Sequence, residues 1–294
     1  MQSPLARDTH AISPLICGVH ARCPVHRCAA RLSEVLVRDT CSLGSPLGGY
    51  ALAPAGHADW SARDGRVLHA LMRAGFGYVT QGNRVLPVLP MRRAVLRLAR
   101  GARRPAKLAA RRKDVARALR NTPPAHPLEL RVSTDLLQAC EKLEAFHEQS
   151  WVGPALVRVW EAMLQAGTLI VLELWCDGAM VAADFGHPIG GSFYVATRWH
   201  DPALAKHQTG FVLALASARL LERCGVALWD LGGTDCSAGM RYKESVSEVV
   251  PRPVFANLFR RVRDAVPADG SLAQRLAAAT GPTGIAITEG DLFS

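Results

Sequence analysis

The sequence has no apolar run long enough to cross a lipid bilayer, because Arg219 interrupts the best candidate. It also has no paired C-x-x-C motif, although three cysteines and two histidines lie between residues 17 and 28. We therefore favour no metal site, and eight scattered cysteines fit a reduced compartment better than a disulfide scaffold. The absence of these features predicts a protein with no membrane partner, no metal and no bound cofactor.

Acidic residues are almost absent from one stretch of the chain. Between residues 92 and 120 there are twelve Lys or Arg and one acid, Asp114, whereas the whole chain has a formal charge of +10. Such a confined positive block favours a polyanionic partner, with a solvated face or flexible loop as the alternative. No aromatic residue interleaves with the charges, which favours phosphate contact over base stacking. Four arginines have helical spacing, and we expect them on one face of a helix: Arg93, Arg97, Arg100 and Arg104.

Changes in composition divide the chain into four parts. Residues 1–47 are basic and poorly defined, and 48–125 are expected to form a small domain with the basic helical arm. A Pro-rich linker at 122–127 precedes the main domain, 126–262, and residues 263–294 are predicted to be a flexible tail. We expect a cytoplasmic protein; organellar targeting by the first segment is the alternative, although its prolines disfavour an amphipathic helix.

The chain is organised around residues 168–230. An Asp-Gly pair and a Gly-Gly pair separate three apolar stretches, which predicts a three-stranded meander. After Pro202 the apolar spacing becomes helical and stops at Gly225, and a short strand then runs from Val226 to Asp230. A helix between two strands of one sheet makes a right-handed crossover, and open sheets of this kind bind ligands at the carboxyl ends of the strands. Asp230 is therefore the first candidate for chemistry.

Outside this segment the patterns are weaker. Residues 76–80 and 84–89 predict a hairpin, 240–244 are expected to be exposed, and 249–255 to form a last strand. His187 and His200 are expected at exposed strand ends.

Several motifs, read in chain order, carry a resemblance to a known family. They are Arg73 to Phe76, Pro90 to Arg93, Ser150 to Ala155, Glu173 to Trp175 with Asp177-Gly178, Gly190 to Phe193, and Val226 to Asp230. In this order and spacing they resemble leucyl/phenylalanyl-tRNA–protein transferases, whose fold is similar to that of the GCN5-related N-acyltransferases (GNAT). The resemblance implies an α+β fold: a GNAT-like mixed sheet with helices on both faces, plus a small amino-terminal α/β domain.

Enzymes of that family move leucine or phenylalanine from aminoacyl-tRNA onto the α-amine of proteins that begin with Arg or Lys, which marks them for degradation. The resemblance implies that Asp230 orients the attacking amine and that Trp151 lies near the terminal adenosine of the tRNA. The residues that would contact the substrate at the aminoacyl pocket are Phe193, Val195, Ala196, Thr197 and Gly232. The residues that would contact tRNA phosphates are Arg92, Arg93, Arg97, Arg100, Arg104, Arg111, Arg112 and Lys206.

The chain differs from the family at three places. Ala196 stands where the family has glutamate, Gly232 where it has glutamine, and Val88-Leu89 where it has a tryptophan pair. These differences leave substrate choice and activity open.

The chemistry demands little of the protein. An aminoacyl ester is already activated, and an α-amine has a pKa near 8, so positioning and one carboxylate that accepts a hydrogen bond suffice. The alternative role for Asp230 is to hold the amides of the turn at Gly232.

Two other functions stay open beside a monomeric aminoacyltransferase with aminoacyl-tRNA and acceptor proteins as partners. One is acyl-CoA-dependent N-acyl transfer, although residues 204–210 lack the Arg/Gln-x-x-Gly-x-Gly/Ala pyrophosphate loop. The other is a catalytically silent RNA-binding relative.

Overall fold

The structure is a computed structural model that describes most of the chain beyond residue 61. The described residues are 50–52, 62–81, 84–90, 92–98, 113–117, 119–120, 127–133, 135–146, 152–234, 241–265, 271–288, 290 and 292.

A small sheet lies at the amino-terminal side. Its strands are β1 (Tyr50–Leu52), β2 (Gly77–Gln81) and β3 (Arg84–Pro90), in the order β1-β3-β2, and α3 (Ala62–Arg73) precedes β2. The pairing of β2 with β3 confirms the predicted hairpin. Helix α3 contacts the main domain, where it packs against α6 (Pro154–Gln165).

The main sheet has eight strands in the order β10-β4-β9-β8-β7-β6-β5-β11. Their bounds are β4 (Arg92–Arg97), β5 (Leu128–Val132), β6 (Ile170–Cys176), β7 (Ala179–Ile189), β8 (Ser192–His200), β9 (Leu228–Gly233), β10 (Glu248–Pro251) and β11 (Ile285–Ala286). Strands β6, β7 and β8 form the predicted meander. Strand β8 pairs with β9 in parallel, and every other recorded pair in this sheet is antiparallel.

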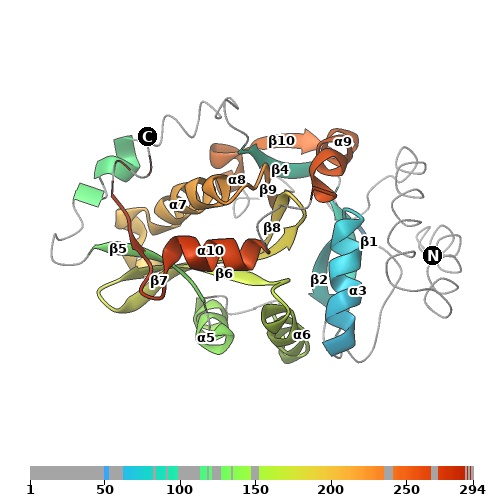
Figure 1. The fold of residues 1–294 in the computed structure, drawn as a ribbon, viewed down its shortest axis with the longest axis horizontal. Helices are drawn as coiled ribbons and strands as arrows, with labels where there is room; N and C mark the ends of the chain where they lie inside the picture. The colour runs from blue at the N-terminus through green and yellow to red at the C-terminus, as the bar shows by residue number, and fades with distance from the viewer. Residues whose placement is uncertain are drawn as a thin grey trace, which may run out of the picture.

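Helices cover both faces of this sheet (Figure 1). One core cluster joins the sheet to α7 (Thr209–Arg223) and α10 (Leu272–Thr280), and the other joins it to α5 (Leu136–Phe146), α6 and α9 (Arg252–Arg263). The α+β, GNAT-like mixed sheet with helices on both faces is therefore confirmed. No helix among the described residues is both long and apolar enough to cross a membrane.

The predicted crossover is present, with small shifts of its bounds. A 3-10 helix, η1 (Pro202–His207), follows β8, and α7 then leads back to β9. Because β9 runs from Leu228 to Gly233, Asp230 lies inside the strand and not at its end.

The basic segment does not begin as a helix. Residues 92–97 form strand β4, which pairs with both β9 and β10, and Ala94, Val95 and Leu96 are buried. The prediction of a helical face through Arg93 and Arg97 is therefore wrong, and Arg100 and Arg104 lie outside the described residues. The linker at 122–127 also does not separate two independent units, since β4 belongs to the main sheet.

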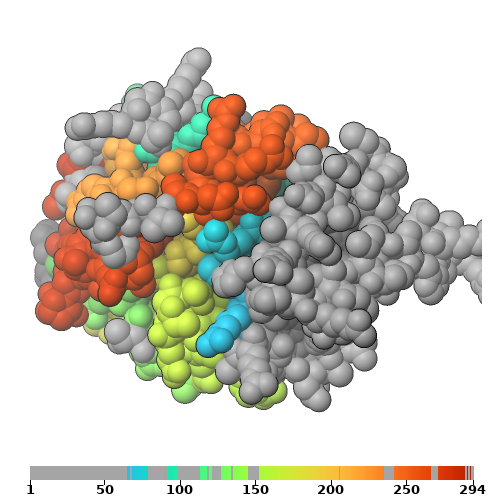
Figure 2. All heavy atoms as spheres, turned by 45° about the vertical axis from the view of Figure 1, so that its right-hand side comes forward, coloured from blue at the N-terminus to red at the C-terminus, as the bar shows by residue number. Residues whose placement is uncertain are grey.

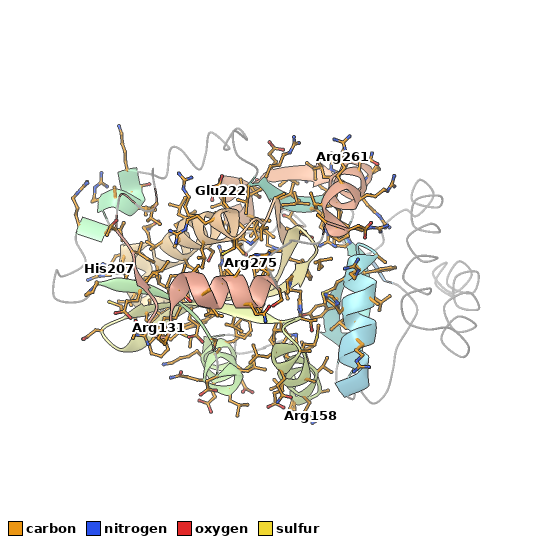
Figure 3. All side chains as sticks on the ribbon, viewed as in Figure 1. Arg131, Arg158, His207, Glu222, Arg261 and Arg275 are labelled. Atoms are coloured by element: carbon orange, nitrogen blue, oxygen red, sulfur yellow. The ribbon has the colours of Figure 1, made fainter. Side chains whose placement is uncertain are left out.

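The carboxyl-terminal part is folded, so the prediction of a flexible tail after residue 262 is wrong. Ser271 and Gln274 form a capping box at the start of α10, and Leu276 is fully buried in the core. Arg275 donates from Nε to the carbonyl of Cys224 at 3.0 Å, and Figure 3 shows Arg275 beside the Glu222 end of α7. Strand β11 extends the main sheet through its pairing with β5.

Three smaller expectations are also corrected. Residues 241–246 form α8 (Arg241–Val246), in which Lys243 is buried, and the strand expected over 249–255 ends at Pro251, where α9 follows. His187 lies inside β7 and is fully buried.

The carboxyl-terminal end of α9 contacts α3. Arg73 and Asp264 form an ion pair at 3.2 Å, and Figure 2 shows the orange-red atoms of α9 beside the cyan atoms of the α3 region.

Candidate functional site

Strands β8 and β9 diverge partway along their length. Their parallel ladder pairs Ser192, Phe193 and Tyr194 with Leu228, Trp229 and Asp230. Beyond these pairs β8 follows β7, whereas β9 follows β4 as far as Gly233. Residues 195–197 of β8 and 231–233 of β9 therefore lie beyond the last β8–β9 pair, where the two strands are no longer paired with each other. We call this place the β8–β9 fork.

A β-bulge lies on the β8 side of the fork. Phe185 pairs with Thr197 and Gly186 with Val195, so Ala196 is the extra residue. A bulged residue leaves its backbone groups outside the ladder, where they can bind another group. The side chains of Phe193 and Val195 are buried, and those of Ala196 and Thr197 are half-buried. The fork thus brings together four of the predicted substrate-binding residues and sets Gly232 opposite them.

Gly232 lies on the β9 side in a backbone conformation that favours glycine. Its φ is 80°, and a Cβ built there would lie 3.4 Å from Tyr194 Cε2 and 3.4 Å from the Val195 carbonyl oxygen. A side chain at this position would be strained and would crowd the fork. This conformation gives a physical reason for the absence of the family's glutamine at Gly232.

Asp230 is buried in an ion pair with Arg93. Arg93 Nη1 donates to Asp230 Oδ2 at 2.8 Å, and the Gly232 amide donates to Asp230 Oδ1 at 2.9 Å. The two side chains are 2% and 1% exposed for Asp230 and Arg93 respectively. Both carboxylate oxygens are therefore already engaged, which corrects the expectation that Asp230 presents a free carboxylate to an amine. The contact with the Gly232 amide is the alternative role that the sequence left open.

Burial raises the pKa of the Asp230 carboxyl, while Arg93, the Gly232 amide and Lys243 counteract that rise. Lys243 approaches from α8 and donates from Nζ to the Gly233 carbonyl at 2.8 Å. Asp230 thus joins β4 to β9, and Lys243 joins α8 to the end of β9 beside the fork.

A second buried pair supports β8 from the other side. Arg198 Nη2 donates to Asp184 Oδ2 at 2.6 Å across the β7–β8 ladder. The Arg198 guanidinium carbon lies 5.6 Å from the ring centroid of Trp229 and 5.5 Å from that of Tyr242. Burial by itself would lower the pKa of Arg198, but the charge and hydrogen bond of Asp184 outweigh that effect. The net pKa is therefore raised, and the Arg198 side chain stays charged.

The predicted tRNA contacts do not form one surface in the described residues. Arg93 is buried, so its assignment as a surface phosphate contact is wrong. Arg92, Arg97 and Lys206 are exposed. Arg97 forms an ion pair with Glu248, with Nη2 and Oε2 3.4 Å apart. Trp151, Arg100, Arg104, Arg111 and Arg112 lie outside the described residues. Lys206 precedes His207, which Figure 3 shows at the opposite side of the molecule from Arg261 of α9.

Besides Lys243, sequence reasoning missed a second buried cationic residue of this region, Arg252. It is the first residue of α9, where the chain was expected to continue as a strand. The signal that was available is Pro253, since proline is favoured in the first turn of a helix.

Two cavities within the described residues lie away from the fork. One, of about 330 Å³, is lined by Arg131, Ser133, Glu173, Trp175 and the end of α10. The other, of about 290 Å³, is lined by α7, β5, β11 and Leu292. Neither contains a predicted site residue. Among the described residues, no group of His, Cys, Asp and Glu side chains is arranged to hold a metal ion.

Comparison with known proteins agrees with the fold. The family model of the acetyltransferase (GNAT) domain matches residues 109–244, a span that contains the meander, α7 and β9. The fold and this match agree on a GNAT-like domain over these residues.

Two curated relatives are more specific. The leucyl/phenylalanyl-tRNA–protein transferase of Nitrosomonas eutropha is 25% identical over 155 residues, which cover 51% of this chain and 62% of the relative. The enzyme of the same name from Thiobacillus denitrificans is 27% identical over 148 residues, with 49% and 59% covered. The chain thus spans about three fifths of the length of the curated relatives that it matches.

Among solved structures, a conserved protein of unknown function from Bacteroides thetaiotaomicron is similar, with a TM-score of 0.40 and 17% identity. That match covers 76% of this chain and 65% of the other. A similarity of this size supports no inference about function.

Proposed function

We propose that the protein transfers leucine or phenylalanine from aminoacyl-tRNA to the α-amine of an acceptor protein or peptide with a basic first residue. The observation that carries this proposal is the ordered set of family motifs, two of which lead into the strands of the β8–β9 fork: Gly190 to Phe193 leads into β8, and Val226 to Asp230 leads into β9. The two transferase relatives, distant as they are, support the same reaction.

In the proposed reaction the acceptor nitrogen attacks the ester carbonyl carbon of the aminoacyl group. A C–N bond forms, the C–O bond to the ribose breaks, and the amine proton passes to the ribose oxygen that leaves. The free α-amine is partly unprotonated at neutral pH, so a strong base is not required. Backbone groups that the Ala196 bulge leaves outside the β7–β8 register are the donors proposed for the charge that develops on the carbonyl oxygen.

In this proposal Asp230 is a positioning residue and does not touch the amine. It fixes the Gly232 amide and Arg93, and so sets the shape of the β9 side of the fork. Holding two reactants in the correct geometry provides much of the rate gain when the acyl group is already activated.

The test is transfer of radiolabelled leucine or phenylalanine from tRNA to a peptide that begins with arginine. The Ala196→Trp variant places a large ring at the fork and should abolish transfer. The matched control is Leu137→Trp on α5, because Leu137 is 56% exposed and can take a larger ring without displacing the core. Absence of labelled product with the wild-type protein, or equal transfer by both variants, would contradict the proposal.

A second candidate is acyl-CoA-dependent N-acyl transfer. It is favoured by the match to the acetyltransferase model and by the buried Thr209 hydroxyl at the start of α7, which has no hydrogen-bond partner among the described residues. Binding of coenzyme A without retention of aminoacyl-tRNA on a filter would support this candidate. Salt-dependent RNA binding with no transfer from either donor would support the silent RNA-binding alternative.

A further inference from the structure

Arg93 has one donor that the surrounding protein does not use. Its guanidinium carbon lies over two aromatic rings, 4.5 Å from the centroid of Phe255 and 5.2 Å from that of Tyr194. Nη1 donates to Asp230, and Nη2 donates to the Gly75 carbonyl at 2.8 Å. Nε is buried and has no hydrogen-bond partner in the described part of the chain. A buried unused donor is costly, and in native proteins it commonly marks a place for a water or a ligand.

Arg252 approaches the same place from the first turn of α9. It precedes Phe255 by three residues, so the two side chains share a helical face. Arg252 is only 8% exposed, and among the described residues no carboxylate or carbonyl pairs with it. Burial lowers the pKa of Arg252 to about 10, and the neighbouring charge of Arg93 adds to that effect. Arg252 therefore carries its charge at neutral pH.

The charges of the described residues around Arg93 do not balance. Arg93 and Arg252 are buried cations, and Asp230 is the one buried carboxylate in this part of the structure that pairs with either of them. The Arg198–Asp184 pair is neutral by itself and does not change this excess. An uncompensated buried charge destabilises a fold strongly, so an excess of cations that persists there calls for an anion.

We propose that Arg252 and the Nε of Arg93 form a binding site for a phosphate group. Guanidinium forks match phosphate oxygens with parallel hydrogen bonds, and the first turn of a helix adds favourable backbone dipoles. The site lies beside the β9 side of the fork, because Arg93 bonds to Asp230 and is paired with Gly233 in the β4–β9 ladder. A phosphate bound there would belong to a nucleotide whose reactive end reaches the fork.

This inference deepens the proposed function, because a nucleotide phosphate near the fork fits a donor that carries its acyl group on a nucleotide. The same phosphate chemistry occurs in the terminal nucleotide of tRNA and in coenzyme A. Binding is measured without turnover, so a failure of the phosphate site and a failure of aminoacyl transfer give different results.

The experiment measures binding of inorganic phosphate, adenosine 5′-monophosphate and coenzyme A to the full chain by calorimetry. Each of the three probes should bind to the wild-type protein if it can present a phosphate to Arg252. Tighter binding of adenosine 5′-monophosphate than of coenzyme A assigns the phosphate to the tRNA end, and the reverse order assigns it to coenzyme A. Binding of none of the probes overturns the site.

The decisive variant is Arg252→Gln, with Arg261→Gln on the exposed side of α9 as its matched control. Loss of one charged hydrogen-bond donor should weaken phosphate binding about 10-fold to 100-fold, whereas the control should bind as the wild type does. Arg252→Lys keeps the charge and should recover part of the affinity.

The same variants separate a binding role from a structural role. Without phosphate, Arg252→Gln should unfold at the same temperature as the wild type or a higher one, because it removes an unpaired buried charge. Phosphate should raise the unfolding temperature of the wild type and of Arg261→Gln more than that of Arg252→Gln. Equal phosphate binding by Arg252→Gln and the wild type, or a lower unfolding temperature of Arg252→Gln without phosphate, would overturn the proposal.

Discussion

Arg93 on β4 and Asp230 on β9 form a buried ion pair, with Nη1 and Oδ2 2.8 Å apart. The two residues are 137 positions apart in the sequence. This pair joins the basic segment to the strand that ends at the β8–β9 fork.

Replacement of Asp230 by asparagine should destabilise the protein by about 3–5 kcal/mol, because it leaves Arg93 charged and buried without a carboxylate. The measurement is the free energy of unfolding from urea denaturation. Asp264→Asn is the control, since it breaks the exposed pair with Arg73 and should cost no more than about 1 kcal/mol. Similar losses in the two variants would show that the buried pair has no special role.

Replacement of Gly232 by alanine should reduce both stability and transfer. The positive φ of Gly232 should cost about 1 kcal/mol, and the new methyl group would contact Tyr194 and the Val195 carbonyl at the fork. Gly178 is the control, because its φ is 71° and a Cβ there meets nothing within 4 Å. We expect similar stability losses from Gly178→Ala and Gly232→Ala but a lower transfer rate only in the latter. Unchanged transfer in Gly232→Ala would separate Gly232 from the site.

Stability should fall in acid because of His187. Trp160 donates to the Tyr78 hydroxyl at 2.9 Å, that hydroxyl lies 2.7 Å from His187 Nε2, and His187 Nδ1 lies 2.8 Å from the Thr168 carbonyl. Burial lowers the pKa of His187 from 6.5 to about 3, so the folded protein keeps the ring neutral while the unfolded chain takes up a proton.

The free energy of unfolding is therefore not reduced by His187 above pH 6.5. It decreases as the pH falls from 6.5 toward about 3, because only the unfolded chain binds the proton in that range. The expected slope is about 1.4 kcal/mol per pH unit in that window. The measurement is the free energy of unfolding at several pH values, compared with His187→Gln, which should lose this slope. Parallel pH profiles for the two proteins would contradict the buried neutral ring.

Replacement of Leu276 by alanine should destabilise the whole protein by about 2–5 kcal/mol, because this residue of α10 is fully buried against the main sheet. Leu137→Ala at an exposed position should change the unfolding free energy by about 0.5 kcal/mol or less. A negligible effect of Leu276→Ala on the unfolding free energy would instead support the prediction that residues 263–294 form a flexible tail.

The features that the sequence predicted well are those with local signals. Turn residues and alternating apolar stretches indicated the β2–β3 hairpin and the β6–β7–β8 meander, and the change to helical spacing indicated the crossover through α7. The capping box of Ser271 and Gln274 was also a local signal, which the alanine-rich composition after residue 265 obscured.

Long-range pairing could not be predicted in the same way. The apolar residues of β4 are flanked by arginines at helical spacing, and their strand partners β9 and β10 come more than 130 residues later. Asp230 was expected at an open strand end because the apolar run from Val226 stops there, and its partner Arg93 had been assigned to a helix. Arg252 has a role only after the chain folds, when α9 brings it to Arg93.

The central claim is most directly tested by offering both donors to the same protein. Leucyl- or phenylalanyl-tRNA and a radiolabelled acyl-CoA are mixed with a peptide that begins with arginine, and the modified peptide is analysed by mass. We predict that leucine or phenylalanine appears on the α-amine and that Ala196→Trp abolishes this product. A peptide that carries only the acyl group of coenzyme A would contradict the account.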